Sequence, residues 1–294
     1  MFQKYPAKIG PHRTVAAISI IFILLSCIAV TGCLNDLGIP DLGSRGSSHQ
    51  AQNDGKLSAY FLDVGQGDAS LIIFGNKTIL IDAGEIDMGD RVVSDLKELG
   101  VSRIDLLVAT HPHSDHIGGM QKVLDNFPVS QVLDSGMPHS SVLYERFLET
   151  IEKKKIPYKV AVQGDAINLD PTLRIVVLSP PEKRFGDDLN TNSIMLRISY
   201  GTINFLFTGD AGGEAETALA KSGYTLDSQI LKVGHHGSMH SSSPAFTARV
   251  HPETAIISLG QDITHTVIRI NKQLTPLLRL EPRSTGLIVT GRSW

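Results

Sequence analysis

Cysteine is almost absent from this chain of 294 residues, and its absence limits the sites that the protein can build. The two cysteines, Cys27 and Cys33, both lie in the N-terminal segment. No disulfide can therefore stabilise the rest of the chain, and no thiolate can bind a metal ion there. The remainder must rely on its hydrophobic core and on any metal ions that other side chains hold.

Positive charge is also scarce once the N-terminus is set aside. Residues 1–32 carry three basic residues and no acidic one, which leaves 24 basic and 30 acidic residues and a net charge of −6. The densest basic stretch, EKKKIP at 152–157, is typical of the solvated end of a helix. A mildly acidic chain without a long basic run lacks the electrostatic footprint of a strong nucleic-acid binder.

One long apolar run is present, from Val15 to Val30, and it follows three basic residues. This order, with small residues before a cleavage point, is typical of a secretory signal. The sequence VTGC, which ends at Cys33, resembles a lipobox, and the resemblance implies cleavage before Cys33 and lipid attachment to its sulfur. LLSC, which ends at Cys27, is a weaker match because Leu25 is large. The alternative is an uncleaved transmembrane anchor.

Either interpretation places the rest of the chain outside the cytoplasm and attaches it to the membrane. We expect a signal peptide over residues 1–32 and a flexible tether over 33–56, a segment rich in small and polar residues without sustained periodicity. A single domain is expected over residues 57–294. Nothing in the sequence indicates an oligomer, so a monomer is the default.

From residue 57 the apolar residues form short runs separated by turns. LSAYFLDVG, ASLIIFG and KTILIDAG predict consecutive strands, whereas DRVVSDLKELG has helical spacing and ends at a glycine. Further strands are expected at 103–110, 130–136, 172–179, 193–200, 203–210, 228–234 and 254–260, and helices at 120–127, 141–155, 212–223 and 243–250. A helix near 267–274 and strands at 277–280 and 286–290 close the chain. The pattern predicts an α/β fold in which two mixed sheets pack together with helices outside.

The stretch THPHSDHIGG, residues 110–119, gathers histidines at the end of a predicted strand. His111 and His113 are two residues apart, so an extended backbone places both on one side, where they can hold one ion. Asp115 and His116 follow at the turn into a helix and are expected to reach a second point nearby. Imidazole and carboxylate suit zinc, manganese or iron. A solvent-exposed histidine-rich loop is the alternative, and the recurrence of His and Asp in LIDAGE, DSGMPH, FTGDAG and KVGHHGS argues against it.

The order of these elements resembles the metallo-β-lactamase superfamily. More narrowly, FLDVGQGDASLI, TILIDAG, THPHSDHIGGM, FTGD and LKVGHHGSMHSSSP are similar to the C-terminal hydrolase domain of ComEC-type DNA-internalisation competence proteins and their stand-alone relatives. The resemblance extends over roughly residues 57–290. It implies a four-layer αββα sandwich that binds two divalent metal ions, with zinc expected and manganese or iron as alternatives.

The resemblance also implies a set of metal ligands: His111, His113 and His139 for the first ion, Asp115, His116 and His235 for the second, and Asp210 as the bridge between them. His235 is preferred to His236 because the superfamily ligand usually follows a small residue, here Gly234. The alternative for His139 is an exposed loop residue. Asp82 is implied to orient the histidine box, residues 111–116, through hydrogen bonds.

Catalytic roles beyond metal binding are implied for Asp115, which can steer water, for His236, which can contact substrate, and for His265, which can bind or protonate the leaving group. His265 departs from the family pattern, because Thr264 and Thr266 flank it where relatives carry GHP.

Three further residues are expected near the substrate. Ser238, with backbone N–H groups of the turn GHHGS, is expected to accept a phosphate oxygen. Asp68 and Asn192 lie in loops that can reach the site, although an ordinary turn role suits each of them equally.

The leading hypothesis for function is a two-metal hydrolase outside the cytoplasm that cleaves a phosphoester of nucleic acid, of a surface polymer or of a lipid headgroup. A lactone, lactam or thioester hydrolase on the same metals is the second hypothesis, because a fold does not fix a function. The third is a non-enzymatic lipoprotein that binds DNA or a partner, with the metal ions as structural supports. The acidic balance argues against DNA binding as the sole role.

Overall fold

Two mixed β-sheets form the centre of the fold. The computed structural model describes residues 56–258, 266–271, 279–282 and 287–290, which all belong to one compact unit, His49–Trp294. Within these residues the strand order of the first sheet is β14-β13-β1-β2-β3-β4-β5-β6, and that of the second is β15-β12-β11-β10-β9-β8-β7.

In the first sheet, β1, β2 and β3 form antiparallel hairpins, and β3 to β6 run parallel. β13 adds antiparallel to β1, and β14 adds antiparallel to β13. The strands are β1 (Lys56–Phe61), β2 (Ser70–Phe74), β3 (Lys77–Ile81), β4 (Leu106–Ala109), β5 (Val132–Asp134), β6 (Tyr158–Val160), β13 (Thr266–Asn271) and β14 (Arg279–Pro282).

The second sheet repeats this plan, with antiparallel hairpins from β7 to β10 and parallel pairing from β10 through β11 to β12. β15 adds antiparallel to β12. The strands are β7 (Ala166–Asp170), β8 (Leu173–Ser179), β9 (Met195–Tyr200), β10 (Ile203–Phe207), β11 (Ile230–Lys232), β12 (Thr254–Ile257) and β15 (Leu287–Thr290).

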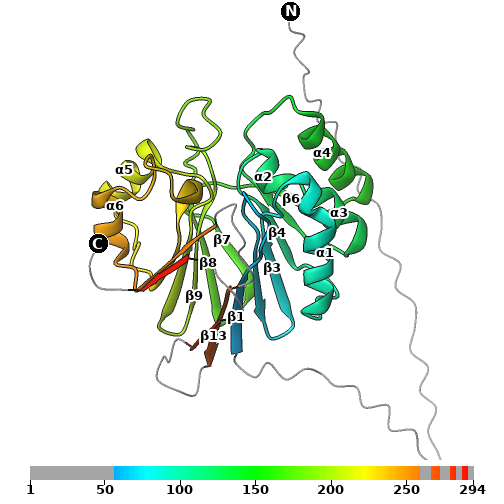
Figure 1. The fold of residues 1–294 in the computed structure, drawn as a ribbon. Helices are drawn as coiled ribbons and strands as arrows, with labels where there is room; N and C mark the ends of the chain where they lie inside the picture. The colour runs from blue at the N-terminus through cyan, green and yellow to red at the C-terminus, as the bar shows by residue number, and fades with distance from the viewer. Residues whose placement is uncertain (1–55, 259–265, 272–278, 283–286, 291–294) are drawn as a thin grey trace, which may run out of the picture. The chain divides into compact units, whose positions relative to one another are not determined.

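Helices cover the outer faces of the two sheets (Figure 1). α1 (Gly89–Glu98), α3 (Met120–Asn126) and α4 (Val142–Lys154) pack on the first sheet, and α5 (Gly213–Lys221) and α6 (Pro244–Val250) pack on the second. Shorter turns are α2 (Ser114–Ile117), η1 (Ile86–Met88) and η2 (Gly234–Gly237). These layers confirm the predicted four-layer sandwich. None of the helices described here combines the length and apolar character needed to cross a membrane.

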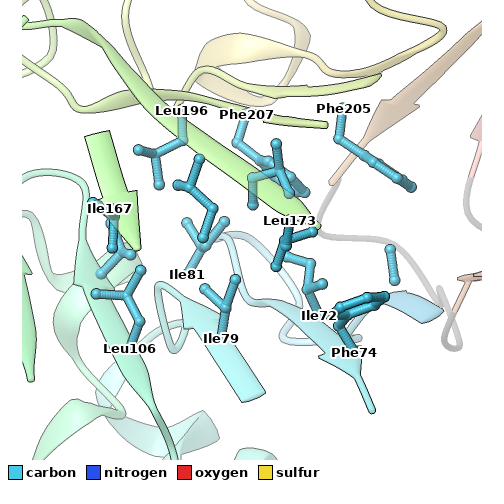
Figure 2. Close-up of a cluster of buried hydrophobic side chains, with 14 of the residues drawn as sticks. Ile72, Phe74, Ile79, Ile81, Leu106, Ile167, Leu173, Leu196, Phe205 and Phe207 are labelled. Atoms are coloured by element: carbon cyan, nitrogen blue, oxygen red, sulfur yellow. The ribbon is translucent and has the colours of Figure 1, made fainter. Parts of the chain in front are cut away.

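Strand periodicity divides the apolar residues between two kinds of core. In β4, Leu106 and Val108 face the second sheet, whereas Leu107 and Ala109 face the helices. Side chains from both sheets fill the space between them, and Figure 2 shows Phe74 and Leu106 of the first sheet in the same cluster as Phe205 of the second. This packing fixes the distance between the two sheets, and therefore between any residues that extend from their strand ends.

The prediction of a helix near 267–274 was wrong, because residues 266–271 form the strand β13. The sequence TVIRIN alternates, and the strand pairs with all of β1, with Thr266 opposite Phe61 and Asn271 opposite Lys56. The short strands β6 and β7 were not predicted. β7 forms a hairpin with β8 that contains an irregularity between Ile167 and Asp170.

Glycine allows the histidine-bearing turn to pack against the end of β3. A Cβ atom on Gly119 would lie 2.2 Å from the carbonyl oxygen of Ala83, and the Gly119 N–H donates to the carbonyl of Gly84. The Ala83 N–H in turn donates to the carbonyl of His116 at 2.7 Å. The turn that carries His116 is thus in direct backbone contact with the segment that carries Asp82.

We predict that Gly119→Ala lowers the free energy of unfolding by about 1–3 kcal/mol, because the methyl group forces two backbone segments apart. The matched control is Gly223→Ala, where a Cβ would meet nothing within 4 Å. Urea denaturation of both variants measures the difference. Equal stability of the two variants would contradict the close packing described for Gly119.

Candidate metal centre

Most of the predicted ligands, and the supporting residue Asp82, lie on segments that follow the carboxyl ends of strands in the two sheets. Asp82 follows β3, the histidine box follows β4, Asp210 follows β10, and η2 follows β11. β3 pairs parallel with β4, and β10 pairs parallel with β11, so the carboxyl ends within each pair point the same way. Each sheet therefore contributes neighbouring side chains to the site.

Four of these side chains converge on one point. Asp115, His116, Asp210 and His236 each offer a ligand atom, and these atoms all lie within 4.8 Å of one another. Nε2 of His116 lies 3.2 Å from Oδ1 of Asp210, yet both atoms are buried without an aligned hydrogen bond. Nε2 of His236 lies 3.1 Å from Oδ2 of Asp115. Buried polar atoms that face one another without partners are costly unless something else binds them.

Asp82 forms hydrogen bonds to the histidine box on the side away from the centre. Its Oδ1 accepts from the Thr110 backbone N–H at 2.9 Å, and its Oδ2 accepts from the Thr110 hydroxyl at 2.7 Å. Nδ1 of His116 lies 2.8 Å from Oδ2, so this nitrogen is the donor and Nε2 faces the centre. The sequence prediction that Asp82 orients the box agrees with these contacts. Asp82 adopts a left-handed backbone with φ 59°, an arrangement that is uncommon outside glycine and typical of functional sites.

His111 and His113 form a second pair of candidate ligands. Nδ1 of His111 lies 3.2 Å from the Thr110 hydroxyl oxygen, which is already a donor to Asp82, so His111 Nδ1 is the donor in this contact. Nε2 of His111 therefore carries the lone pair, and it faces Nδ1 of His113 at 3.0 Å. His139 lies beside this pair, with its ring centroid 6.3 Å from that of His113. Its Nδ1 shares a hydrogen bond with the Ser141 hydroxyl.

The structure reverses the expected roles of the adjacent histidines 235 and 236. His236 is buried and lies in the four-residue group, whereas His235 is half-exposed and has its Nε2 3.5 Å from the Asn190 amide nitrogen. Both residues adopt left-handed backbone, with φ 49° and 52°. This conformation turns the second histidine inward, so the geometry favours His236 as ligand and His235 as its neighbour.

The buried charges of the centre compensate one another through protons. Burial opposes ionisation of Asp210, but the neighbouring imidazoles of His116 and His236 outweigh it and lower the pKa of Asp210. Burial likewise lowers the pKa of His116, yet Asp82 and Asp210 raise it well above its usual value. For His236, burial is again outweighed, by a hydrogen bond to Asp115 and by the nearby Asp210 carboxylate, and its pKa rises to about 9. Protonated His116 and His236 thus offset the negative charge of the neighbouring carboxylates Asp82, Asp115 and Asp210.

The residues fit a divalent metal ion. They supply imidazole nitrogens and carboxylate oxygens, which zinc, manganese and iron all accept. The unbonded atoms Nε2 of His116 and Oδ1 of Asp210 face the centre. A second cluster, formed by Asp68, Asp82 and His116, also brings ligand atoms within 4.8 Å, but the ammonium group of Lys232 already binds Asp68, and Asp82 is bonded to Thr110 and His116.

Of the three residues expected near the substrate, Ser238 alone lines the pocket. Asp68 is buried against Lys232 and is not part of the open pocket. Asn192 is fully buried and organises its own loop, accepting from the Phe185 N–H and donating to three carbonyls. Ser238 lines the pocket as expected, but its N–H donates to the carbonyl of His235 and is not available to a phosphate. His265 and Cys33 lie outside the described residues.

An open pocket of about 430 Å³ lies over the centre. It is lined by Gln66, His113, Asp115, Asn190, Asp210, His235, His236, Gly237 and Ser238. Gln66, Asn190 and Lys232 were missed by the sequence analysis. Gln66 and Asn190 each lie two residues from a polar residue that was chosen, Asp68 and Asn192, so the loops were identified but not the side chains that face the pocket.

The chain matches the family model described as the metallo-beta-lactamase superfamily over residues 62–261. It is 31% identical over 269 residues to competence protein ComA of Neisseria gonorrhoeae, which covers 88% of this chain and 36% of that protein. It is 27% identical over 219 residues to ComE operon protein 3 of Bacillus subtilis, which covers 68% and 28%. The chain thus spans about a third of the length of these relatives.

Among solved structures, the metallo hydrolase Igni18 from Ignicoccus hospitalis is 17% identical to this chain with a TM-score of 0.44. The match covers 67% of this chain and 80% of that one.

We predict that His236→Ala weakens zinc binding at least about tenfold, because the ring that faces Asp115 and Asp210 is lost. His235→Ala is the matched control, since it removes the neighbouring imidazole from the same strained turn and leaves the ligand group intact. Competition titration with a chromophoric chelator measures both affinities. A larger loss of zinc affinity in His235→Ala than in His236→Ala would support the sequence-based assignment of His235 as the ligand.

The raised pKa of His236 predicts opposite pH effects on the metal-free and metal-bound protein. Because its folded pKa is about 9 against 6.5 for the free side chain, its stabilisation of the metal-free fold is complete below pH 6.5 and is lost as pH rises through about 9. A metal ion needs the neutral imidazole, so zinc binding strengthens over the same range.

The melting temperature of the metal-free protein should therefore fall between pH 6.5 and 9, while the increase caused by zinc should grow. Thermal melts with chelator and with saturating zinc test this, and His236→Ala should flatten the metal-free curve. A metal-free melting temperature that stays constant over this range would contradict the prediction.

Proposed function

This chain belongs to the metallo-beta-lactamase superfamily of metal-dependent hydrolases, and we propose that it uses two metal ions to hydrolyse a phosphoester. The position of Asp210 is the observation that carries this proposal. Its Oδ1 lies 3.2 Å from His116 Nε2, whereas its Oδ2 lies 3.8 Å from His111 Nε2 and 3.6 Å from His236 Nε2. The Asp210 carboxylate thus faces His111, a candidate ligand of the first ion, as well as His116 and His236, candidate ligands of the second. A bridging ligand requires this arrangement.

In this proposal His111, His113 and Asp210 would hold the first ion, with His139 beside them. Asp115, His116, His236 and Asp210 would hold the second. When bound, a pair of divalent ions lowers the pKa of water toward neutrality and polarises the bond to be cleaved.

The protein's own groups prepare the site for this chemistry. Asp82 and Thr110 fix the ring orientation and tautomer of His116 and His111, so that the lone pairs face the centre. Asp115 is half-exposed at the pocket and can steer an approaching water. The remaining ligand side chains are buried or half-buried, which limits competition from solvent.

The lining of the pocket favours a phosphoester. Beyond the ligands it offers the amides of Gln66 and Asn190, the imidazole of His235 and the hydroxyl of Ser238, which can donate hydrogen bonds to phosphate oxygens. The relatives named competence protein ComA and ComE operon protein 3 favour the phosphodiester of a nucleic acid over a polymer or lipid headgroup.

We also propose that the reaction takes place outside the cytoplasm, with the domain attached to the membrane through a lipid on Cys33. The support is the order of basic residues, apolar run and VTGC in the sequence. Membrane attachment would confine the enzyme to substrates near the cell surface.

We predict that the metal-loaded protein hydrolyses bis-p-nitrophenyl phosphate, and that Asp210→Ala lowers kcat by at least about 100-fold because both ions lose a shared ligand. DNA, nitrocefin and a lactone are assayed in parallel. Gly223→Ala, which alters an exposed site outside the ligand group and the pocket lining, serves as the unchanged control. Turnover of nitrocefin or lactone without phosphodiesterase activity would replace the proposal with the second hypothesis, and no turnover with two ions bound would overturn it.

A further inference from the structure

A buried ion pair lies directly behind the imidazole of His236. Asp68 and Lys232 are 4% and 2% exposed. The Lys232 ammonium lies 2.7 Å from Oδ1 of Asp68 and donates a hydrogen bond to Oδ2 at 2.8 Å. The pair joins residues 164 positions apart and links the loop after β1, in the first sheet, to β11 of the second.

The carboxylate of Asp68 faces the edge of the His236 ring that is opposite the metal centre. Oδ1 of Asp68 lies 3.6 Å from Nδ1 of His236, while Nε2 lies 3.1 Å from Asp115. Because the hydrogen bond of Lys232 is directed to Oδ2, both Oδ1 and Nδ1 are buried without an aligned partner. Oδ1 also has the Lys232 ammonium beside it, whereas Nδ1 of His236 faces the Asp68 carboxylate, and a slightly closer approach makes Nδ1 the donor and leaves the lone pair on Nε2.

His116 is held in the same way. Its Nδ1 lies 2.8 Å from Asp82, and its Nε2 lies 3.2 Å from Asp210. An oxygen of Asp68 lies within 4.8 Å of one of Asp82, so two buried carboxylates lie side by side behind two histidines. Such a pair of anions needs a cation, and Lys232 supplies it.

The backbone of Asp68 touches a further member of the ligand group. The Asp68 N–H donates to the carbonyl of Asp115 at 3.1 Å, and the carbonyl of Asp68 accepts from Gly84 at 2.8 Å. Gly67 has φ 140°, and a Cβ there would lie 2.4 Å from the Asp115 carbonyl oxygen. The segment 67–68 therefore contacts Asp115 through its backbone and His236 through its side chain.

We propose that Asp68 and Lys232 are positioning residues for the second metal ion. Asp68 fixes the ring orientation and tautomer of His236, and Lys232 holds the Asp68 carboxylate in place. The inference rests on the proposed two-metal function. It replaces the sequence expectation that Asp68 contacts substrate.

Asp68→Asn tests the proposal because it keeps the shape of the side chain but presents an amide to His236. If the amide N–H points at Nδ1, the ring must accept there and its proton moves to Nε2, where it blocks metal binding. In the detergent-solubilised full-length protein we expect zinc to bind the second site about 10–100-fold more weakly, with the first equivalent unchanged. The matched control is Asp105→Asn, which removes a buried carboxylate paired with Lys77 and Arg103 at the beginning of β4.

Chelator competition titrations resolve the two equivalents. The proposal is supported if Asp68→Asn weakens binding of the second zinc equivalent only and Asp105→Asn weakens binding of neither. Unchanged binding of both equivalents in Asp68→Asn overturns it. If the wild-type protein binds fewer than two ions, the two-metal function fails on its own. If it binds two but cleaves no phosphoester, the substrate proposal fails and the positioning role stands.

A measurement on the unmodified protein covers the case in which Asp68→Asn does not fold. Long-range ¹⁵N–¹H NMR of the zinc-loaded protein, with the His236 signal identified by its loss in His236→Gln, reports which ring nitrogen carries the proton. A protonated Nδ1 and a metal-bound Nε2 are expected. A proton on Nε2, or metal on Nδ1, would overturn the role assigned to Asp68.

Discussion

The hydrogen bond between the His116 imidazole and the buried Asp82 carboxylate is the interaction on which the candidate metal centre depends. Asp82 receives the Thr110 N–H, the Thr110 hydroxyl and Nδ1 of His116, and these bonds turn Nε2 of His116 toward Asp210. The left-handed backbone of Asp82 costs conformational energy, which the surrounding hydrogen bonds offset. Parallel pairing of β3 with β4 brings Asp82 and Thr110 together at the same sheet edge. Backbone topology and side-chain chemistry thus support one another at this point.

Protons and metal ions are alternative ways to neutralise the buried acids of this centre. In the metal-free protein, the carboxylates of Asp115 and Asp210 raise the pKa of His236, and those of Asp82 and Asp210 raise that of His116. A metal ion displaces those protons while it supplies the same positive charge. The centre can therefore stay folded in both states, because the geometry that attracts a proton to Nε2 is also the geometry that presents a lone pair to a metal.

Most of the fold and the main ligand segments could be predicted from the sequence, because both depend on local patterns. Strand ends are marked by apolar runs, and His and Asp at those ends are visible directly. The choice between His235 and His236 depends on two consecutive left-handed residues, which no apolar pattern encodes. For Asp68 the sequence offered only a substrate contact or a turn role, because its partner Lys232 lies 164 positions away. Residues 267–271 were predicted as helix because their pairing partners in β1 lie even farther away in the sequence.

The two sheets contribute different halves of the centre, so the core between them determines its geometry. The histidine box and Asp82 extend from the first sheet, and Asp210 and His236 extend from the second. Closely packed side chains between the sheets resist changes in their separation, which keeps the ligand atoms at fixed distances. The pocket residues Gln66, Asn190 and Ser238 lie instead on connecting segments. Loops tolerate sequence change more readily than packed strands, so substrate choice can change at this rim while the metal ligands stay in place. The positions of the ligands thus depend on the core between the sheets, whereas Gln66 and Asn190 at the pocket rim depend on the conformation of their loops.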